Sequence, residues 1–380
     1  MLTTQITWVA ISRSAIRHNI RQLQRIVSPS TQFMAVVKSN AYGHGLIEVA
    51  KIAKQAKVSW LATVNLDEAL ELRASGIKGR ILVLSYYHPD KIKEAIKKNI
   101  TLTVYGYAAA KKINAAAKLL RTKTKVHFKV DTGTSRLGVL PLDCAPMLHK
   151  IRQLDNIKIE GIFSHFADAE NLNQAFTNRQ INTFNKIVSE LEIQNIKIPL
   201  KHLACSASTI LNKESHQDLI RIGIALYGLW SIEKKGWLAK KLLPGLNLRP
   251  ALSWYTTIIQ LKKLPPHSTV GYGASYKTNK DTTLALVPVG YWEGYDRKLS
   301  NTGEVIIRGK RCSIRGRVCM NLMMIDVTSL PNVKVGDRVI LIGQEGKESI
   351  TADELANKIK TINYEIITRI NPLINRVYIK

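Results

Sequence analysis

Basic, hydroxyl and imidazole side chains stand at or just after the ends of five short apolar runs in the first 230 residues. A lysine amine held in a partly dehydrated site loses its proton more easily than one in water, and the neutral amine can form a Schiff base with an aldehyde. Such groups act together only if the fold brings the ends of the runs to one place. These side chains belong to Lys38, Lys129 with Arg136 in the loop that follows it, His165 and Ser206, and the fifth run contains Gly223.

The spacing of the apolar runs predicts a fold that would bring these groups together. Eight β-rich runs alternate with helix-period segments, which is the pattern of parallel βα units. We expect a (β/α)8 TIM-like barrel, whose active site is built from the loops at the carboxyl ends of its strands. The runs cover residues 33–37, 60–64, 81–84, 101–104, 126–130, 159–163, 202–205 and 220–226.

Three of the intervening segments carry helix signals of their own. The segment from Asn65 to Gly76 opens with a capping residue, has acids in its first turn and ends at a glycine. Residues 91–98 and 176–193 have amphipathic spacing. These three segments are therefore predicted to be helices.

After about residue 240 the sequence changes to strands joined by turns, which predicts a second, β-rich domain. We expect the barrel over 12–240 and the C-terminal β domain over 245–380, with Pro244-Gly245 and Pro250 at the junction. The strand-like residues 1–11 precede the barrel and are expected to join the C-terminal sheet.

The composition places limits on the function. The chain has 380 residues and a net charge of +28, and the segment Ala95–Val130 holds nine Lys or Arg residues and no acid. That charge invites a nucleic-acid interpretation, but no zinc-finger, helix-turn-helix or aromatic RNA-binding motif is present. We expect a solvated basic surface that attracts anionic small molecules, and no dedicated nucleic-acid binding.

Cysteine content and hydropathy indicate the cellular compartment. The four cysteines are too few for a disulfide scaffold, and none forms the C-x-x-C pair typical of zinc sites, so no metal is expected. The sequence contains no run of eighteen apolar residues, the length needed to span a bilayer, and the first segment lacks the pattern of a signal peptide. These features predict a cytoplasmic protein that has no membrane association.

The last two predicted strands offer a phosphate site. Loops after strands seven and eight of such barrels commonly hold phosphate, which indicates Ser206 and the backbone at Gly223 and Ile224. A phosphate opposite Lys38 suggests pyridoxal phosphate. Each residue alone also fits a structural role: Lys38 as a solvated charge, His165 and Ser206 as packing and capping groups, Arg136 and Arg221 as ion-pair partners.

The run from Ala35 to Gly45, Ala-Val-Val-Lys-Ser-Asn-Ala-Tyr-Gly-His-Gly, resembles the cofactor-lysine motif of bacterial alanine racemases. Further motifs match that family in order, so the resemblance covers essentially the whole chain. They are Lys129–Gly133, Arg136–Gly138, Arg221–Ile224, Leu226–Gly228, Val270–Gly273, Gly316–Met320 and Asn363–Ile366.

The resemblance implies a pyridoxal 5′-phosphate enzyme in which Lys38 forms the Schiff base with the cofactor. His165 would pack beside the cofactor ring. Arg221 would face the pyridine nitrogen, and because a guanidinium does not readily give up a proton, that nitrogen should stay unprotonated. The phosphate would be held by Tyr42, Ser206, Gly223, Ile224 and Tyr364.

The resemblance also implies the reaction. Racemisation of alanine needs a base on each face of the α-carbon of the external aldimine, with Lys38 acting on D-alanine and Tyr272 on L-alanine. Arg136 and the backbone amide of Met320 would bind the substrate carboxylate, and Lys129 would be carbamylated. The expected protein is an isomerase and a homodimer with shared active sites, which supplies D-alanine for the peptidoglycan of the cell wall.

Three departures from the family pattern leave the substrate open. Asn321 stands where many members have Asp, Cys205 where Asn usually precedes the phosphate serine, and the bulky Trp292 where a small residue is usual. A racemase of serine, lysine or several amino acids therefore remains an alternative. A pyridoxal-phosphate decarboxylase of basic amino acids is a second one, although the motifs around Arg136 and Tyr272 argue against it.

Overall fold

The computed structural model describes residues 5–231 and 245–380. The chain divides into two compact units. The barrel unit comprises residues 15–41 and 46–249, and the β unit comprises residues 1–14, 42–45 and 250–380. Pro244, one of the expected junction residues, and the expected barrel end at residue 240 lie outside the described residues.

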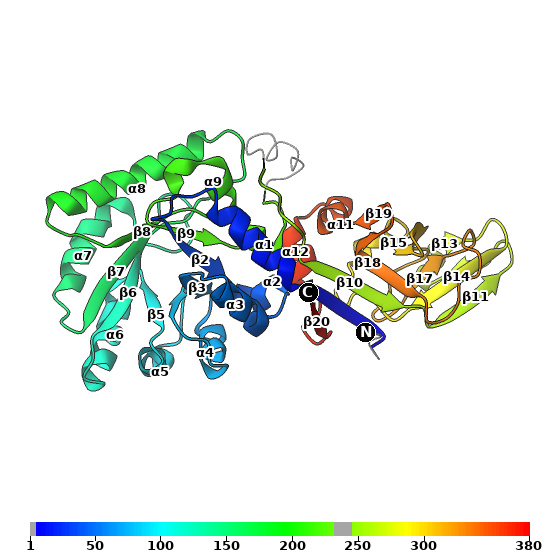
Figure 1. Cartoon of the computed structure of the whole chain (residues 1–380), viewed down its shortest axis with the longest axis horizontal. Coiled ribbons are helices and arrows are strands. Elements are labelled where there is room, and N and C mark those ends of the chain that lie inside the picture. Colours follow the sequence, from blue (N-terminus) through cyan, green and yellow to red (C-terminus); the bar gives the residue numbers. More distant parts are fainter. Residues whose placement is uncertain (1–4, 232–244) are drawn as a thin grey trace. The chain divides into compact units, whose positions relative to one another are not determined.

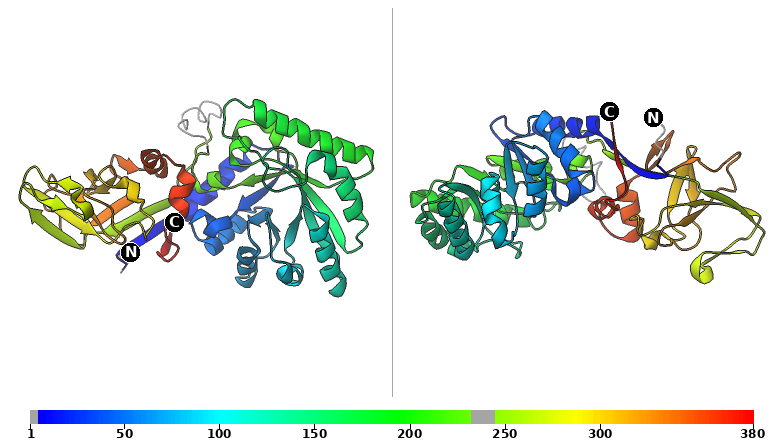
Figure 2. Two further views of the ribbon diagram at one scale, coloured as in Figure 1. Left: turned by 180° about the vertical axis from the view of Figure 1, so that it is seen from behind. Right: turned by 90° about the horizontal axis from the view of Figure 1, so that it is seen from below.

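Eight parallel strands form the barrel unit, and helices lie on the outside of the strands (Figures 1 and 2). The order around the sheet is β8-β7-β6-β5-β4-β3-β2-β9. Each strand overlaps one of the eight predicted runs, although β8 shares only His202 with its run and β9 ends four residues before its run does, so the predicted TIM-like barrel is confirmed. The strands are β2 (Gln32–Val36), β3 (Trp60–Thr63), β4 (Arg80–Val83), β5 (Thr101–Val104), β6 (Thr124–Lys129), β7 (Ile157–Phe163), β8 (Leu200–His202) and β9 (Leu219–Ile222).

Two backbone hydrogen bonds join the ends of this order. The amide of Asp218 donates to the carbonyl oxygen of Lys201, and the amide of Arg221 donates to that of Ala204, both at 3.1 Å. The first and last strands of the order are thereby linked, and the sheet is nearly closed.

The helices of the barrel unit follow the predicted alternation. At α4 the side chain of Asn65 accepts a hydrogen bond from the amide of Glu68 at 2.8 Å, which confirms the predicted cap. Gly76 follows the helix with φ +79°, a conformation that glycine adopts without strain. The helices are α1 (Arg13–Gln24), α3 (Leu46–Gln55), α4 (Leu66–Ala74), α5 (Ile92–Lys97), α6 (Tyr107–Leu119), α7 (Cys144–Arg152), α8 (Ala175–Ile193) and α9 (Ser206–Leu211).

The β unit is built on a seven-stranded sheet in the order β16-β15-β18-β10-β1-β20, with β19 paired to β18. Strand β1 lies between β10, to which it is antiparallel, and β20, to which it is parallel. A second sheet has the order β11-β14-β17, and β12 pairs with β13.

The strands of the β unit are β1 (Thr7–Ser12), β10 (Leu252–Thr257), β11 (Gln260–Leu264), β12 (Thr269–Val270), β13 (Tyr276–Lys277), β14 (Thr282–Val287), β15 (Glu304–Ile307), β16 (Lys310–Ser313), β17 (Met323–Asp326), β18 (Arg338–Glu345), β19 (Glu348–Ile350) and β20 (Arg376–Ile379). Two helices, α11 (Ala352–Ile359) and α12 (Asn363–Thr368), were not predicted from the sequence. The core contains the fully buried Trp254 and Tyr295, whose ring centroids are 6.0 Å apart.

Within the described part of the chain, no helix is both long and apolar enough to cross a membrane.

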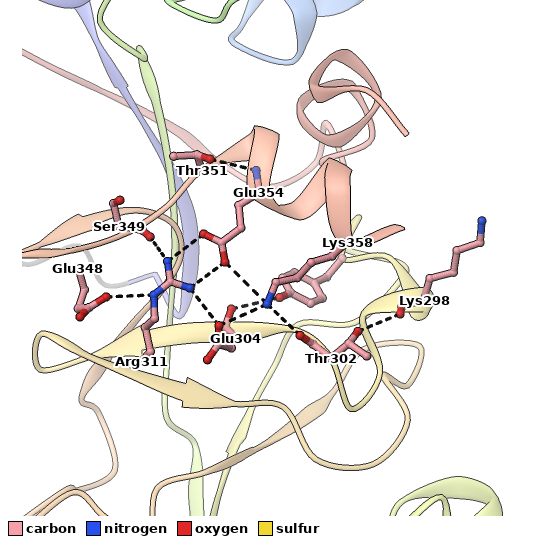
Figure 3. Close-up of polar contacts among 10 residues, drawn as sticks. Lys298, Thr302, Glu304, Arg311, Glu348, Ser349, Thr351, Glu354 and Lys358 are labelled. Atoms are coloured by element: carbon pink, nitrogen blue, oxygen red, sulfur yellow. Dashed lines mark hydrogen bonds and ion pairs between the residues drawn. The ribbon is translucent and has the colours of Figure 1, made fainter. Parts of the chain in front are cut away.

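Arg311 and the three glutamates paired with it form a charged cluster that joins β15, β16, β19 and α11 (Figure 3). The Arg311 guanidinium makes ion pairs with Glu304 and Glu348 at 3.0 Å and a two-point contact with Glu354 at 2.7 and 2.9 Å. The contact with Arg311 lowers the pKa of Glu354 below its ordinary value of 4.5. Because one guanidinium serves three carboxylates in a half-buried setting, the cluster should stabilise the β unit more than a lone surface pair would.

Replacing this arginine is expected to destabilise the protein in a pH-dependent way. Arg311→Gln should lower the free energy of unfolding at neutral pH by about 1 to 2 kcal/mol, because three carboxylates lose their shared partner. The folded-state pKa of Glu354 is depressed, so this stabilisation is present above pH 4.5 and is lost as the pH falls through the folded-state value. Urea unfolding of the intact protein at neutral and at acidic pH measures it.

The exposed Lys347 of the same unit provides the control, since Lys347→Gln removes the same charge. An equal loss of stability in both variants, or a loss for Arg311→Gln that does not shrink in acid, would contradict the role of the cluster.

Candidate active site

Polar groups from five strands meet at the carboxyl end of the barrel. Lys38 lies two residues beyond β2, Lys129 is the last residue of β6, and His165 lies two residues beyond β7. Ser206 begins α9 after β8, and Gly223 directly follows β9. In parallel βα barrels the catalytic groups come from this end of the strands, because the eight βα loops converge there.

The segment that carries Lys38 has an unusual backbone. In α2 (Lys38–Tyr42), Ser39, Asn40 and Ala41 have φ values of 56°, 53° and 52°, and Tyr42 follows with 54°. Four successive residues other than glycine are thus left-handed, a conformation that costs roughly 1–2 kcal/mol per residue. Strained backbone of this kind persists where the surroundings hold it, often at functional sites.

The amine of Lys38 lies in a setting that favours its neutral form. Burial lowers its pKa from the ordinary value of 10.5, the positive charge of Arg136 lowers it further, and the negative charge of Glu68 opposes the shift. A lysine with a lowered pKa is a better nucleophile towards an aldehyde.

Ser206 and the residues after β9 form a compact group of hydrogen-bonding groups. The amides of Gly223 and Ala225 donate to Ser206 Oγ at 3.0 and 3.3 Å, and Ile224 lies between them at the start of a short 3-10 helix, η4 (Ile224–Tyr227). A hydroxyl beside successive backbone amides is the donor set that suits a phosphate.

Cys205 precedes this group as the residue before α9, and its amide donates to Ser208 Oγ at 3.0 Å. Burial raises the pKa of its thiol, so the side chain stays uncharged. A neutral thiol therefore stands beside the donor group.

Arg221 lies buried in β9 and is held by four hydrogen bonds. Its two terminal nitrogens donate to His202 Nδ1 at 2.8 Å and to the carbonyl oxygens of His202, Ser164 and Leu203 at 2.7 to 2.9 Å. No residue in the described part of the chain accepts from its Nε–H group. Burial lowers the pKa of Arg221 to about 10, so it remains a cation at neutral pH.

Two histidines support this arginine, and sequence reasoning did not identify either. His202 Nδ1 accepts from Arg221, so its proton lies on Nε2, which is 2.8 Å from His127 Nδ1. The hydrogen-bond pattern thus requires both rings to be neutral. Burial first, then the charge of Arg221, lowers the pKa of His127 to about 3 and that of His202 well below 6.5.

Lys129 is a second lysine with a weakened hold on its proton. Burial, then the charges of Arg221 and Arg136, lowers its pKa to about 8. Its Nζ lies 5.2 Å from the centroid of the Phe163 ring. His165 is likewise kept neutral, because burial and the same cations lower its pKa well below 6.5.

The loop that presents Arg136 is organised by Asp131. One carboxylate oxygen accepts from the amides of Gly133, Thr134 and Ser135 at 2.8 to 3.2 Å, and the other accepts from the amide of Arg136 at 2.9 Å. Burial alone would raise the pKa of Asp131, but these amides outweigh it and lower the pKa below 3.8. The Arg136 backbone is therefore fixed, while its side chain is exposed.

The β unit presents the other predicted residues. Tyr42 and Tyr364 lie together there, with ring centroids 6.1 Å apart. Tyr272 begins η5 (Tyr272–Ala274) between Gly271 and Gly273, and its side chain is 72% exposed. Met320 is 56% exposed, and its backbone amide donates no hydrogen bond within residues 5–231 and 245–380.

The turn that carries Met320 is tied to the turn that carries Trp292. The amide of Trp292 donates to the carbonyl oxygen of Met320 at 2.9 Å, and the side chain of Asn321 donates to Glu293 at 2.9 Å. A Cβ at Gly290 would lie 2.1 Å from the carbonyl oxygen of Cys319, so these turns can approach only with glycine there. Asn321 thus forms a hydrogen bond with a carboxylate, whereas an aspartate at this position would face that carboxylate with like charge.

In the part of the chain that the structure describes, no three His, Cys, Asp or Glu side chains are close enough to hold a metal ion.

Known proteins are similar to this chain over both its barrel part and its β-rich part. The family model described as "Alanine racemase, N-terminal domain" matches residues 11–231, and "Alanine racemase, C-terminal domain" matches residues 251–378. An alanine racemase of Methanococcus maripaludis is 42% identical over 98% of both chains. One of Halothermothrix orenii is 40% identical over 99% of this chain and 97% of its own.

Solved structures agree in fold. An alanine racemase of Clostridium difficile has a TM-score of 0.92 at 34% identity, covering 100% of this chain and 97% of its own. A structure of alanine racemase from Bacillus anthracis with bound L-Ala-P has a TM-score of 0.91 at 35% identity, covering 100% and 96% of the two chains.

Proposed function

The chain belongs to the alanine racemase family of isomerases, and we propose that it interconverts L-alanine and D-alanine with pyridoxal 5′-phosphate, using Lys38 and Tyr272 as its two proton carriers. The observation that carries the proposal is the barrel mouth, where a lysine with a lowered pKa, an anion-binding donor group and a buried arginine converge. Full-length similarity to alanine racemases supports alanine as the substrate.

The donor groups of the barrel fit this cofactor. Ser206 Oγ with the backbone of Gly223 and Ile224 would hold the phosphate, and the family resemblance assigns the same role to Tyr42 and Tyr364. The Nε–H of Arg221 meets no acceptor in the described residues, so it would donate to the pyridine nitrogen, and His165 would pack beside the ring. When bound, the cofactor supplies an electron sink for the carbanion at the α-carbon.

The protein groups would then divide the remaining work. Lys38 Nζ would anchor the cofactor and exchange the α-proton of D-alanine, and Tyr272 Oη would exchange that of L-alanine. Arg136 and the amide of Met320 would bind the substrate carboxylate, and a bidentate guanidinium suits that role. The L-Ala-P bound by the Bacillus anthracis relative supports a site built for an alanine-like ligand.

We extend the proposal to a homodimer with shared sites. Tyr272 and Met320 are largely exposed together with Trp292, which is 58% exposed. A proton carrier works in a shielded site, because water weakens electrostatic control and competes for protons. A second copy of the chain would provide that shield for each copy.

In the cell, D-alanine from this reaction would supply peptidoglycan synthesis. The four cysteines are free thiols, which fits a reducing compartment and supports a cytoplasmic location. Cell fractionation tests the location, and racemase activity confined to an external fraction would contradict it.

A racemase that accepts larger amino acids is the second candidate. Trp292 bears on the choice between the candidates, because this bulky residue is tied by its backbone to the turn that presents Met320 and would change the space available to a substrate there. Relative turnover of alanine, serine and lysine decides between the candidates.

The function is tested by incubating the protein with pyridoxal phosphate and L-alanine in deuterated water. We expect optical activity to vanish while deuterium enters the α-carbon, because each turnover removes one proton and returns another from solvent-exchanged groups. Polarimetry and mass spectrometry follow both changes. If optical activity persists and no deuterium enters the α-carbon while the cofactor is bound, alanine is excluded as the substrate.

Tyr272→Phe separates the two proton carriers. Loss of the hydroxyl should slow exchange of the α-proton of L-alanine by about 100-fold or more, with a much smaller effect on exchange from D-alanine, which uses Lys38. Initial rates of α-deuterium washout from each enantiomer measure this. Tyr276→Phe in the same unit is the control, and equal losses for both enantiomers would disprove the assigned roles.

Carbamylation of Lys129 should depend on pH. Carbon dioxide adds to the neutral amine and a proton is released, so a lysine with a pKa of about 8 should react increasingly as the pH rises through that value. NMR of the protein equilibrated with ¹³C-labelled bicarbonate should show a carbamate signal that Lys129→Gln abolishes. Lys125→Gln, in the same strand, should retain the signal; no signal from the parent protein would exclude the modification.

A further inference from the structure

Glu68 makes a contact that its position in helix α4 does not require. It is the third residue of the helix, and its amide is bound by the cap residue Asn65 at 2.8 Å. In a capping box the side chain at this position returns to the backbone of the cap residue. Here Glu68 Oε1 instead accepts from the backbone amide of Asn40, at 2.8 Å, in the segment that carries Lys38.

The segment that receives this contact needs support from outside. Its residues from Ser39 to Tyr42 are all left-handed, a conformation that is strained for residues other than glycine. Two local hydrogen bonds help, from the amide of Ala41 to the carbonyl oxygen of Val37 at 2.9 Å and from the amide of Leu46 to Asn40 Oδ1 at 2.8 Å. Glu68 adds an oxygen acceptor from a neighbouring βα unit, at hydrogen-bond distance from the Asn40 amide.

The Glu68 carboxyl group is partly buried beside this segment. Burial raises its pKa above the ordinary value of 4.5, while the hydrogen bonds from the amides of Asn40 and Ser39 and the charge of Lys38 oppose that shift. The same group acts on Lys38 in return, since its negative charge opposes the loss of the lysine proton.

We propose that Glu68 is a positioning residue that holds the segment from Lys38 to Tyr42 in its left-handed conformation, and thereby fixes Lys38 and Tyr42 for the cofactor. Without this acceptor the segment would relax towards right-handed or extended backbone, and both side chains would change direction. The part of this inference that concerns the cofactor depends on the proposed function; the part that concerns the backbone does not.

Two substitutions of Glu68 separate the effect of side-chain length from the effect of its negative charge. Glu68→Gln keeps an oxygen acceptor at the same distance and removes the charge, whereas Glu68→Asp keeps the charge and shortens the side chain by one CH₂ group. We expect Glu68→Asp to raise the amide hydrogen-exchange rate of the peptide spanning residues 38–46 at least about tenfold, which corresponds to about 1.4 kcal/mol. Glu68→Gln should stay within about threefold of the parent protein.

Cofactor retention gives a second, independent readout on the holoenzyme. The absorbance of bound pyridoxal phosphate should be lost on dialysis about tenfold faster from Glu68→Asp and at nearly the parent rate from Glu68→Gln. Ser39→Gly added to Glu68→Asp should restore much of the protection and retention, because glycine takes a positive φ without strain. Asn65→Ala, which removes the cap of the same helix, controls for general loosening of α4.

Each outcome decides the proposal. The reverse order, with Glu68→Gln impaired and Glu68→Asp intact, would show that charge on Lys38 is what matters and would overturn the positioning role. Equal damage by Asn65→Ala would also overturn it, since helix stability would then explain the effect. If the parent protein binds no pyridoxal phosphate, the proposed function fails, while the exchange measurement still tests the backbone role.

Discussion

The barrel and its site both depend on the hydrogen bonds of Arg221. The backbone amide of Arg221 helps to link β8 and β9, and its guanidinium binds carbonyl oxygens at the ends of β7 and β8. One buried cation therefore joins three neighbouring strand ends through charge-assisted hydrogen bonds. Because four of its five N–H groups are used in this way, the direction of the remaining Nε–H is set by the fold.

The same cation sets the electrostatics of the barrel mouth. Burial is the main cause that lowers the pKa values of Lys38, Lys129, His165 and His202, and neighbouring cations add to it: Arg136 for Lys38, and Arg221 foremost for the other three. This arrangement costs stability, because like charges repel and buried charges lose hydration. The positive charge at the barrel mouth suits a ligand that carries phosphate and carboxylate groups. The positive net charge of the whole chain also attracts anions from solution.

Backbone strain is the second cost that the site carries. The left-handed segment after β2 and the glycine-dependent turns around Gly271 and Gly290 place Lys38, Tyr272 and Met320 where regular secondary structure would not. Such conformations persist because hydrogen bonds from other elements hold them, from Glu68 in the barrel unit and from Glu293 in the β unit. The site therefore depends on these supporting carboxylates as well as on the side chains that they position.

The amino-acid sequence determined the barrel, because each strand overlaps a short apolar run and the runs alternate with helix-period segments, so local pattern alone specifies the alternation. It also identified the chemical groups at the strand ends, since residue type and order along the chain are sufficient for that. Helices α11 and α12, the pairing of Ser206 with Gly223, the roles of His127 and His202 and the contact of Glu68 with Asn40 were decided only by the tertiary structure. The physical reason is that these contacts join residues far apart in the chain: Glu68 signals a helix start in the sequence, and only the packing of neighbouring βα units turns its carboxylate towards the backbone beside Lys38.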